Sequence, residues 1–481
     1  MASFADLSTI NAILRDHPDV EQVAVEAQAD RGEGQQRLIV HVVLLDRSPE
    51  ARELRFSLFY FADAEAGSRE DKYRLYLEGA RFADTHGFEA IWTPERHFHE
   101  NGGLYPNPAV LSAALATLTK NVRLRAGSVA LPLHHPLRVA EEWSVVDNLS
   151  GGRVDISFTS GWIPNDFSIA PQPGVFHRKR EAMFELLDQV QRLWEGGAIP
   201  MRDGVGNEVH LQIFPKPIQP RLPIWITCSG DPAAFVRAGE MGFNVLTALL
   251  TQPIEEAAEK AAIYRAARAR VGLDPAGGCV TLMLHTFLGR DEAEVRAKVE
   301  RPLTEYLKSH IGLMKTMVQS LNLKLDQMDL TDPRLAAYLA SFAFERYYRM
   351  GSLIGPPEKC LSMVNRIKAM GFDEVACLID FGVPVDAVLE SLPVLHELKT
   401  LSDASAGAHR GRLQGYLRDR LGADLPPMKI MIVDHLPRGA DDASAKAAER
   451  AAPAQDVDER ARRQKAAQER QRQLMRTGRK Q

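Results

Sequence analysis

The sequence has few of the features that mark secreted or membrane-spanning proteins. Only four cysteines occur in its 481 residues, and their scattered positions match no metal-binding pattern. Scattered thiols are typical of proteins in the reducing cytosol. No apolar run reaches the roughly 18 residues needed to span a membrane, and the N-terminus lacks a basic segment followed by an apolar one. We therefore expect a soluble, cytoplasmic protein with no membrane partner.

The sequence also lacks a strong excess of charge. Its formal net charge of −4 gives no reason to expect nucleic acid as a partner. Hydrophobic residues make up 45% and charged residues 25%, as in an ordinary globular protein. The C-terminal segment differs, because basic residues far outnumber acidic ones after Arg460. We predict that residues 441–481 form a basic tail that is either disordered or helical.

Several catalytic motifs are absent as well. The chain has no Walker A motif, no GxSxG and no HExxH, and no GxGxxG follows the first predicted strand. Instead, short apolar runs alternate with helical patterns along the middle of the chain. Eight such alternations favour an α/β fold with a closed, TIM-like (β/α)8 barrel over an open sheet. The predicted strands are 56–61, 90–93, 122–127, 154–158, 224–227, 245–248, 280–288 and 375–379.

The two ends of the chain have a different pattern. Predicted elements there are a helix at 7–15, strands at 20–27 and 37–45, a second helix at 412–421 and a strand at 429–434. Neither end has enough apolar residues for its own core, so we predict one small split α+β subdomain into which the barrel is inserted. The predicted domains are its two halves at 1–52 and 401–440, the barrel at 53–400 and the tail at 441–481.

The active site of such a barrel lies where its strands end. Polar or glycine-containing segments at predicted strand ends are Thr93–His99, Gly127–Pro136, Thr159–Phe167 and Thr227–Pro232. In the last of these, Ser229 and Gly230 directly precede a predicted helix. Such a turn offers free N–H groups and the positive end of the helix dipole, which suit a phosphate. An ordinary helix N-cap is the simpler alternative.

Four histidines lie in these segments: His97, His99, His134 and His135. No further ligand with metal-site spacing accompanies them, so we predict no metal site. His97 directly follows the second strand and is the best candidate for polar chemistry, although a structural histidine is the alternative. Glu95 and Arg96 could equally form a surface ion pair. Trp162 is either part of the core or a wall for a planar ligand.

Together these segments resemble the bacterial luciferase-like flavin monooxygenases. The most specific matches are WTPERHF at 92–98, YPNP at 105–108 and AGSVALPLHHPLRVAEEWSVVDNLSGGRVDISFTSGWIPNDF at 126–167, and DEVACLIDFG at 373–382 supports the last strand. The resemblance is closest to the branch found in nonribosomal peptide and polyketide gene clusters. It implies a TIM-like barrel that binds reduced FMN supplied by a separate flavin reductase, uses O2 and forms a homodimer.

The resemblance also implies functions for particular residues. The implied cofactor-binding residues are Gly127 and Ser128 beside the flavin ring, Ser160, Gly161 and Trp162 near the flavin and its phosphate, and Ser229 and Gly230 at the phosphate. The candidate catalytic residues are His97, Arg96 and Glu95. Arg96 stands where luciferase-type sites have the first of two adjacent histidines.

Two positions depart from the pattern of this branch. Ile163 follows Trp162 where the branch usually has His, and Ala248 stands where the sixth strand usually has His. Two polar groups are therefore missing from the predicted barrel mouth. This loss is consistent with a shifted substrate or with weakened activity.

The flanking segments resemble a different family. INAILRDHPDVEQVAV at 10–25 and RLIVHVVL at 37–44 look like the start of an adenylation-domain C-terminal subdomain, and 411–439 looks like its end. The lysine that this family expects after Leu-Pro is absent, since Arg438 follows Pro437. The large ATP-binding core is absent too. The resemblance therefore implies that adenylation is lost and that the remnant contacts a carrier protein.

The sequence thus predicts an enzyme, a flavin-dependent monooxygenase. It would use FMNH2 and O2 to hydroxylate an aminoacyl or peptidyl intermediate tethered to a carrier protein in secondary-metabolite biosynthesis. Two alternatives stay open. A deazaflavin-dependent oxidoreductase would share the barrel, and a non-catalytic adaptor would recruit carrier proteins through the split subdomain.

Overall fold

The computed structural model describes residues 7–17, 20–29, 36–44, 53–61, 71–99, 102–250, 252–309, 333–421 and 428–432. The chain forms two units. Glu53–Asp403 make up the barrel unit, whereas Met1–Arg52 and Ala404–Gln481 belong to one small unit. The tail predicted at 441–481 lies outside the described residues.

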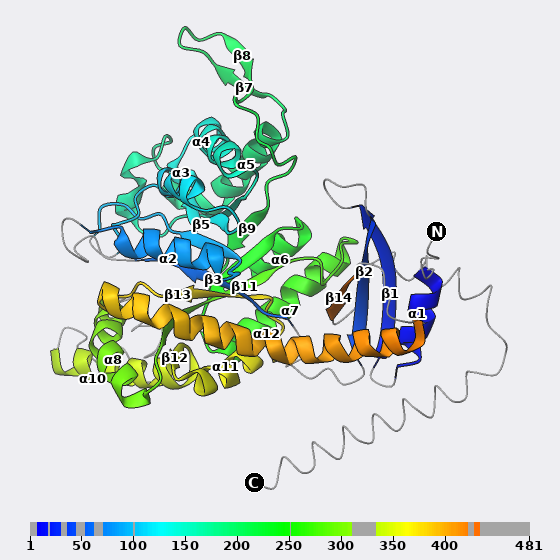
Figure 1. Cartoon of the computed structure of the whole chain (residues 1–481). Coiled ribbons are helices and arrows are strands. Elements are labelled where there is room, and N and C mark those ends of the chain that lie inside the picture. Colours follow the sequence, from blue (N-terminus) through cyan, green and yellow to red (C-terminus); the bar gives the residue numbers. More distant parts are fainter. Residues whose placement is uncertain are drawn as a thin grey trace. The chain divides into compact units, whose positions relative to one another are not determined.

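Eight of the described strands form a closed parallel barrel (Figure 1). They are β3 (Arg55–Phe59), β4 (Ala90–Thr93), β5 (Arg123–Ala130), β6 (Val154–Thr159), β9 (Ile224–Thr227), β10 (Asn244–Ala248), β11 (Val280–Leu288) and β13 (Glu374–Leu378). Neighbours pair in the order β10-β9-β6-β5-β4-β3-β13-β11, and β10 pairs with β11 to close the ring. The predicted TIM-like α/β barrel is confirmed. Buried parallel strands are continuous apolar runs, which is why the sequence pattern located them.

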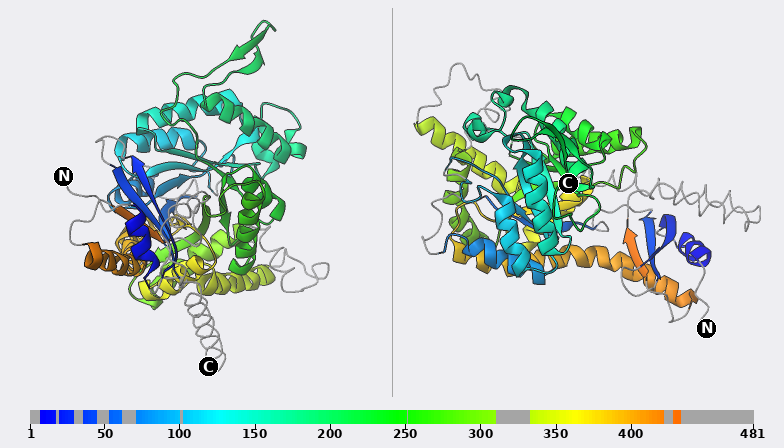
Figure 2. Two further views of the ribbon diagram at one scale, coloured as in Figure 1. Left: turned by 90° about the vertical axis from the view of Figure 1, so that its right-hand side faces the viewer. Right: turned by 90° about the horizontal axis from the view of Figure 1, so that it is seen from above.

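Helices surround the barrel strands (Figure 2). They are α2 (Arg74–Thr85), α3 (Pro108–Leu118), α4 (Pro136–Ser150), α5 (Lys179–Trp194), α6 (Pro232–Glu240), α7 (Ile254–Arg270), α8 (Glu292–Ser309), α10 (Pro333–Met350), α11 (Pro357–Ala369) and the first part of α12 (Val385–Leu421). Local chemistry sets their ends. Asn107 caps α3 by accepting from two backbone N–H groups, and Gly151 ends α4 with a left-handed φ of 72°. No helix in the described ranges is both long and apolar enough to cross a membrane.

Several shorter elements escaped the sequence patterns. An antiparallel hairpin of β7 (Ile199–Arg202) and β8 (Glu208–Leu211) projects from the barrel unit (Figure 1). β12 (Leu353–Gly355) pairs with β11. The short 3-10 helices are η2 (Leu131–Leu133) after β5, and η3 (Pro164–Ile169) and η4 (Val175–Arg178) after β6. Two of these, η2 and η3, shape loops at the C-terminal ends of the strands.

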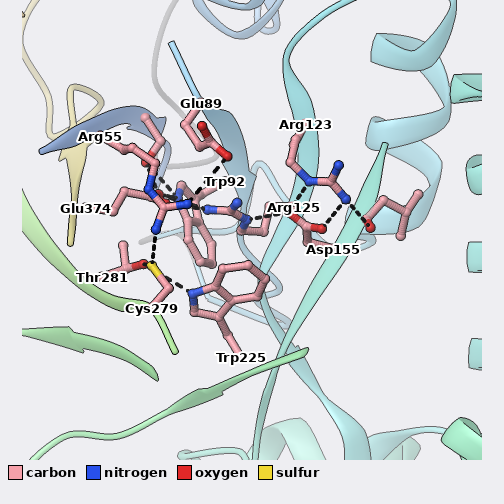
Figure 3. A network of polar contacts seen from close by, with 12 residues as sticks. Arg55, Glu89, Trp92, Arg123, Arg125, Asp155, Trp225, Cys279, Thr281 and Glu374 are labelled. Atoms are coloured by element: carbon pink, nitrogen blue, oxygen red, sulfur yellow. Dashed lines mark hydrogen bonds and ion pairs between the residues drawn. The ribbon is translucent and has the colours of Figure 1, made fainter. Parts of the chain in front are cut away.

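A buried ion network closes the N-terminal end of the barrel (Figure 3). Arg125 donates from Nε to Asp155 Oδ2 at 2.8 Å and from Nη1 to Glu374 Oε1 at 2.8 Å. Its guanidinium lies over the rings of both Trp92 and Trp225, 4.5 and 4.1 Å from their centroids. Burial alone would lower the pKa of Arg125, but the two carboxylates raise it above its ordinary value. Arg125 therefore stays charged. Arg125, Asp155 and Glu374 are here called the bottom network.

The small unit combines both ends of the chain. Its sheet consists of β1 (Val20–Ala29), β2 (Gln36–Leu44) and β14 (Met428–Ile432), and α1 (Leu7–Arg15) belongs to the same unit. β2 pairs antiparallel with β1 and parallel with β14. Its core contains Ile10 and Leu14 from α1 together with Leu413 and Leu417 from the end of α12. Segments about 400 residues apart in sequence therefore share one small core.

One helix prediction was wrong in its extent. The helix predicted to begin at Arg412 is the last part of α12, which already begins at Val385. Gly407 and Gly411 suggest a break in the sequence. The alanines that precede Gly411 have the highest helix propensity, and the helix continues through both glycines.

Candidate active site

Four loops lie at the C-terminal end of the barrel strands. They follow β4, β5, β6 and β9, which are consecutive neighbours in the sheet. Parallel strands place all their C-terminal ends at the same end of a barrel. The four predicted site segments therefore lie at the same end of the barrel, the C-terminal end of its strands, here called the barrel mouth. The loop after β4 is three strands from the loop after β9.

A buried carboxylate organises the first of these loops. Glu95 is only 1% exposed, and its Oε1 is 2.8 Å from Nε2 of His97 and 2.5 Å from Nε2 of His134. Its Oε2 accepts from the backbone N–H of Ala130 at 2.8 Å. Glu95 thus joins the loop after β4 to the end of β5. This Glu95–His97–His134 group replaces the surface Glu95–Arg96 pair that the sequence left open.

The hydrogen bonds of this group fix its charges. Burial alone would raise the pKa of Glu95, but hydrogen bonds from His134 and His97 outweigh it and hold the pKa below its usual 4.5. Burial alone would lower the pKa of His134, but Glu95 raises it above its usual 6.5. Glu95 is therefore an anion that orients His97 through Nε2. The hydrogen bond to Glu95 leaves the other ring nitrogen of His97, Nδ1, outside this group.

The same three residues could hold a metal ion, since their ligand atoms lie within 4.8 Å of one another. Glu95, His97 and His134 have no standard metal-site spacing in the sequence, so no metal site was predicted there. The separations of 2.5 and 2.8 Å are those of hydrogen bonds. Two ligand atoms on a tetrahedral zinc ion would lie roughly 3.3 Å apart. The geometry therefore favours a proton-sharing group over a metal centre.

The remaining two histidines lie elsewhere. His135 is the N-cap of α4 and accepts from the backbone N–H of Leu137 through Nδ1 at 3.3 Å. Nε2 of His99 lies 3.7 Å from Oδ1 of Asp166 in η3. Neither belongs to the Glu95–His97–His134 group.

Arg96 faces a second, loosely paired group. Its Nη1 lies 3.5 Å from Oδ2 of Asp166, and its guanidinium lies over the ring of Trp162 at 5.3 Å. Trp162 is 57% exposed, so it does not belong to the core. Arg96 Nε and Asp166 Oδ1 are buried atoms without a hydrogen-bond partner among the described residues. Buried polar atoms of this kind mark a place for a ligand or water.

Burial acts on both charges of this pair. It lowers the pKa of Arg96 below its ordinary value. It also raises the pKa of Asp166, despite the opposing effect of Arg96. Both groups are therefore held in their charged forms less firmly than a close ion pair would be. Asp166 was missed as a site residue, although it lies within the motif after β6.

The end of β5 makes a close approach that only glycine allows. The Gly127–Ser128 peptide bond is cis. A Cβ on Gly127 would lie 2.9 Å from the rings of Phe59 and Trp92. The hydroxyl of Ser128 bonds to Thr227 and, at 3.0 Å, to Ser157. Three neighbouring strands therefore present a cluster of hydroxyl groups at the barrel mouth.

The loop after β6 turns at a glycine with no room for a side chain. Gly161 has a φ of 79°, and a Cβ there would lie 2.8 Å from the ring of Phe167. Ser160 beside it is half-buried. Ile163, at one expected histidine position, is the N-cap of η3, and Ala248 lies half-buried at the end of β10. The two aliphatic replacements remove polar groups from this end of the barrel.

The turn after β9 is open to solvent. Ser229 and Gly230 are exposed, and a Cβ on Gly230 would have no neighbour within 4 Å among the described residues. Asp231 is the N-cap of α6 and accepts from the N–H of Ala233 at 3.0 Å. The helix N-cap at this turn is thus Asp231. Ser229 and Gly230 do not serve as the cap and stay available to a ligand.

Basic residues at the start of α5 lie beside this turn. Arg180 Nη1 lies 2.8 Å from Asp231 Oδ2. Lys179 Nζ donates to the carbonyl of Trp162 at 3.4 Å. Neither residue was predicted as part of the site. A usable signal was present, because Arg178, Lys179 and Arg180 are consecutive at a helix N-terminus, where cations are unfavourable unless an anion is near.

Known proteins resemble the barrel unit of this chain. Residues 53–374 match the family model of luciferase-like monooxygenases. The oxygenase component of the flavin-dependent trigonelline monooxygenase of Acinetobacter baylyi is 28% identical over 348 residues, 70% of this chain and 92% of that protein.

Solved structures share the barrel. The oxygenating constituent of 3,6-diketocamphane monooxygenase of Pseudomonas putida, in complex with FMN, has a TM-score of 0.57 at 17% identity and covers 74% of this chain and 98% of its own. The coenzyme F420-dependent tetrahydromethanopterin reductase of Methanopyrus kandleri has a TM-score of 0.53 at 14% identity, with 72% and 99% covered. At these identities both structures support the fold alone.

Proposed function

This chain belongs to the luciferase-like monooxygenase family, and we propose that it uses FMNH2 and O2 to hydroxylate an aminoacyl or peptidyl group tethered to a carrier protein. The pathway would be one of secondary-metabolite biosynthesis. The observation that carries the proposal is the mouth itself. A buried Glu95 orients His97, Arg96 is only loosely paired, and the turn at Ser229 and Gly230 is open.

The residues at the mouth fit FMN. Free N–H groups and the positive end of the α6 dipole suit the FMN phosphate at Ser229 and Gly230, and Arg180 lies beside them. The close approach at Gly127 and the exposed ring of Trp162 provide apolar surface near β5 and β6 for a planar ring. When bound, FMN supplies the redox chemistry with O2, and the protein orients the reactants.

Three residues would act on the reacting groups. Arg96 would donate hydrogen bonds to an anionic oxygen or to the substrate carbonyl, as its weak contact with Asp166 leaves donors available. His97 would exchange a proton through Nδ1. Glu95 would hold the His97 ring in one orientation. These side chains lie 11–13% exposed or less, so little water competes with the substrate.

The reduced flavin would come from a separate flavin reductase. The trigonelline enzyme is named as an oxygenase component, which supports a division of this kind. The chain is also proposed to form a homodimer. Large apolar side chains exposed on α3 and α4 support this partner: Val110, Leu118, Val145 and Leu149.

The small unit would serve the carrier protein. We propose that it is the remnant of an adenylation-type C-terminal subdomain that has kept its core of Ile10, Leu14, Leu413 and Leu417. A packed core without the ATP-binding partner suits a binding module. Under the adaptor alternative, binding a carrier protein is the only function of the whole protein. Substrate-dependent O2 consumption would exclude that alternative.

Candidate loaded carrier proteins provide the test. The protein is mixed with FMN, a flavin reductase, NADH and O2, and each carrier is then examined by mass spectrometry. We expect one carrier-bound acyl group to gain a single oxygen atom. If no loaded carrier gains oxygen while free small substrates do, the tethered substrate is wrong and the monooxygenase assignment stands.

The deazaflavin alternative is favoured by one observation, the shared fold with a coenzyme F420-dependent reductase. Titration with oxidised FMN and with coenzyme F420, followed by their absorbance, separates the two readings. We expect FMN to bind more tightly. Tighter binding of coenzyme F420 would instead favour a deazaflavin-dependent enzyme that transfers hydride.

A further inference from the structure

A buried glutamine supports the open turn after β9. Gln252 is 1% exposed and lies on the loop between β10 and α7. Its Nε2 donates to the carbonyl of Ala248 at 2.9 Å, to Oγ1 of Thr247 at 3.2 Å and to the carbonyl of Ser229 at 3.3 Å. One side-chain amide therefore ties the end of β10 to the turn that precedes α6.

A buried lysine sets the direction of this amide. Lys260 on α7 is 4% exposed, and its Nζ donates to Oε1 of Gln252 at 2.7 Å and to Glu256 at 2.7 Å. An ammonium group can only donate hydrogen bonds, so the amide oxygen of Gln252 must face Lys260. The amide N–H groups are thereby turned toward the carbonyls of Ser229 and Ala248.

We propose that Lys260 is a positioning residue for the phosphate of FMN, acting through Gln252 on the turn at Ser229 and Gly230. The inference rests on the proposed function, because it assumes that this turn receives the phosphate. Lys260 does not touch the phosphate itself. It holds Gln252 in the orientation that restrains the Ser229 carbonyl.

This support matters because the turn is open to solvent. Ser229 and Gly230 are exposed, and no described atom lies within 4 Å of a Cβ on Gly230. A loop that is free before binding loses conformational entropy when it binds, and preorganisation removes that cost. The sequence hides this arrangement, since Lys260 lies 31 residues after Ser229 and on a different helix.

The test compares FMN with riboflavin, which has the same ring system but no phosphate. Dissociation constants are measured for both by fluorescence quenching. We expect wild-type protein to prefer FMN. In Lys260→Met, we expect FMN affinity to fall roughly tenfold, a typical effect of a residue that orients a binding group. Riboflavin affinity should stay unchanged, so the ratio of FMN affinity to riboflavin affinity should fall by the same factor.

A second variant distinguishes lost positioning of the turn from lost folding of the protein. Gln252→Glu keeps a partner for Lys260 but cannot donate to the Ser229 carbonyl, so it should lose the FMN preference while the protein stays folded. Lys368→Met is the matched control. Lys368 is also fully buried and donates to the carbonyl of Ser402 at 3.0 Å, between α11 and α12. It should lower stability and leave the FMN preference intact.

The outcomes separate the inference from the function. An FMN preference that survives in both Lys260→Met and Gln252→Glu would overturn the positioning role alone. A wild-type protein that binds FMN and riboflavin equally would remove the phosphate site and the inference with it. A lost preference in Lys368→Met would show that any buried lysine has this effect, which also overturns the specific role of Lys260.

Discussion

The two ends of the barrel treat buried charge in opposite ways. At the N-terminal end, Arg125 is bonded to Asp155 and Glu374 at 2.8 Å and lies over the rings of two tryptophans. At the mouth, Arg96 reaches Asp166 only at 3.5 Å, and Arg96 Nε and Asp166 Oδ1 have no hydrogen-bond partner among the described residues. A satisfied network stabilises the fold, whereas an unsatisfied one keeps its bonding capacity for a ligand. Stability and chemistry thus belong to opposite ends of the barrel.

Breaking the bottom network should have the largest effect. Arg125→Met leaves Glu374 buried without its ion-pair partner, whereas Asp155 keeps Arg123. The unpaired carboxylate costs about 3–5 kcal/mol of unfolding free energy. Urea unfolding measures the loss. Replacing the matched arginine at the mouth, Arg96→Met, should change stability by less than about 1 kcal/mol. Equal losses in the two variants would erase the contrast between the ends.

Changing a site residue at the barrel mouth should leave the fold intact and remove the enzymatic activity. In His97→Gln, product formation should fall about 100- to 1000-fold because proton exchange is lost, and FMN affinity should stay within twofold. The control is His135→Asn, in which Asn keeps the N-cap of α4. Turnover of a loaded carrier measures both variants. A similar fall in the control would mean that His97 has no special role.

The proton-sharing group gives the mouth a pH dependence. The raised pKa of His134 contributes stability that is present below pH 6.5 and lost as pH rises through the folded pKa. The lowered pKa of Glu95 contributes stability that is present above pH 4.5 and lost as pH falls. His134→Gln should therefore cost about 1–2 kcal/mol near pH 5.5 and clearly less near pH 9. The unfolding free energies of the wild type and the variant are measured at the two pH values. An equal loss at both would show that Glu95 and His134 do not form a charged pair.

The smallest effect concerns the turn after β9. Asp231→Asn keeps the N-cap of α6 but removes a negative charge beside the proposed phosphate and frees Arg180. FMN affinity should rise about threefold, with stability changed by less than about 0.5 kcal/mol. Calorimetric titration measures the affinity. Weaker FMN binding in this variant would place the phosphate elsewhere.

The sequence predicted what depends on local pattern. The eight barrel strands are short and rich in apolar residues, and the position of Ser229 and Gly230 before Pro232 indicates a helix N-terminus. The contacts that organise the site are long-range and were missed. Glu95 meets His134 across 39 residues, Arg96 meets Asp166 across 70, and Gln252 meets Ser229 across 23. Only the folded barrel brings such side chains together, so no periodicity could reveal them.

The central claim is that the barrel mouth transfers oxygen from O2 to a carrier-bound group. Isotopically labelled O2 tests it most directly. The protein, FMN and a flavin reductase are incubated with NADH and the loaded carrier under labelled O2, and the tethered product is analysed by mass spectrometry. The account predicts that one labelled oxygen atom enters the product in wild-type protein and is lost in His97→Gln. Oxygen that comes from water, or a carrier-bound group that is oxidised without gaining oxygen, would contradict it.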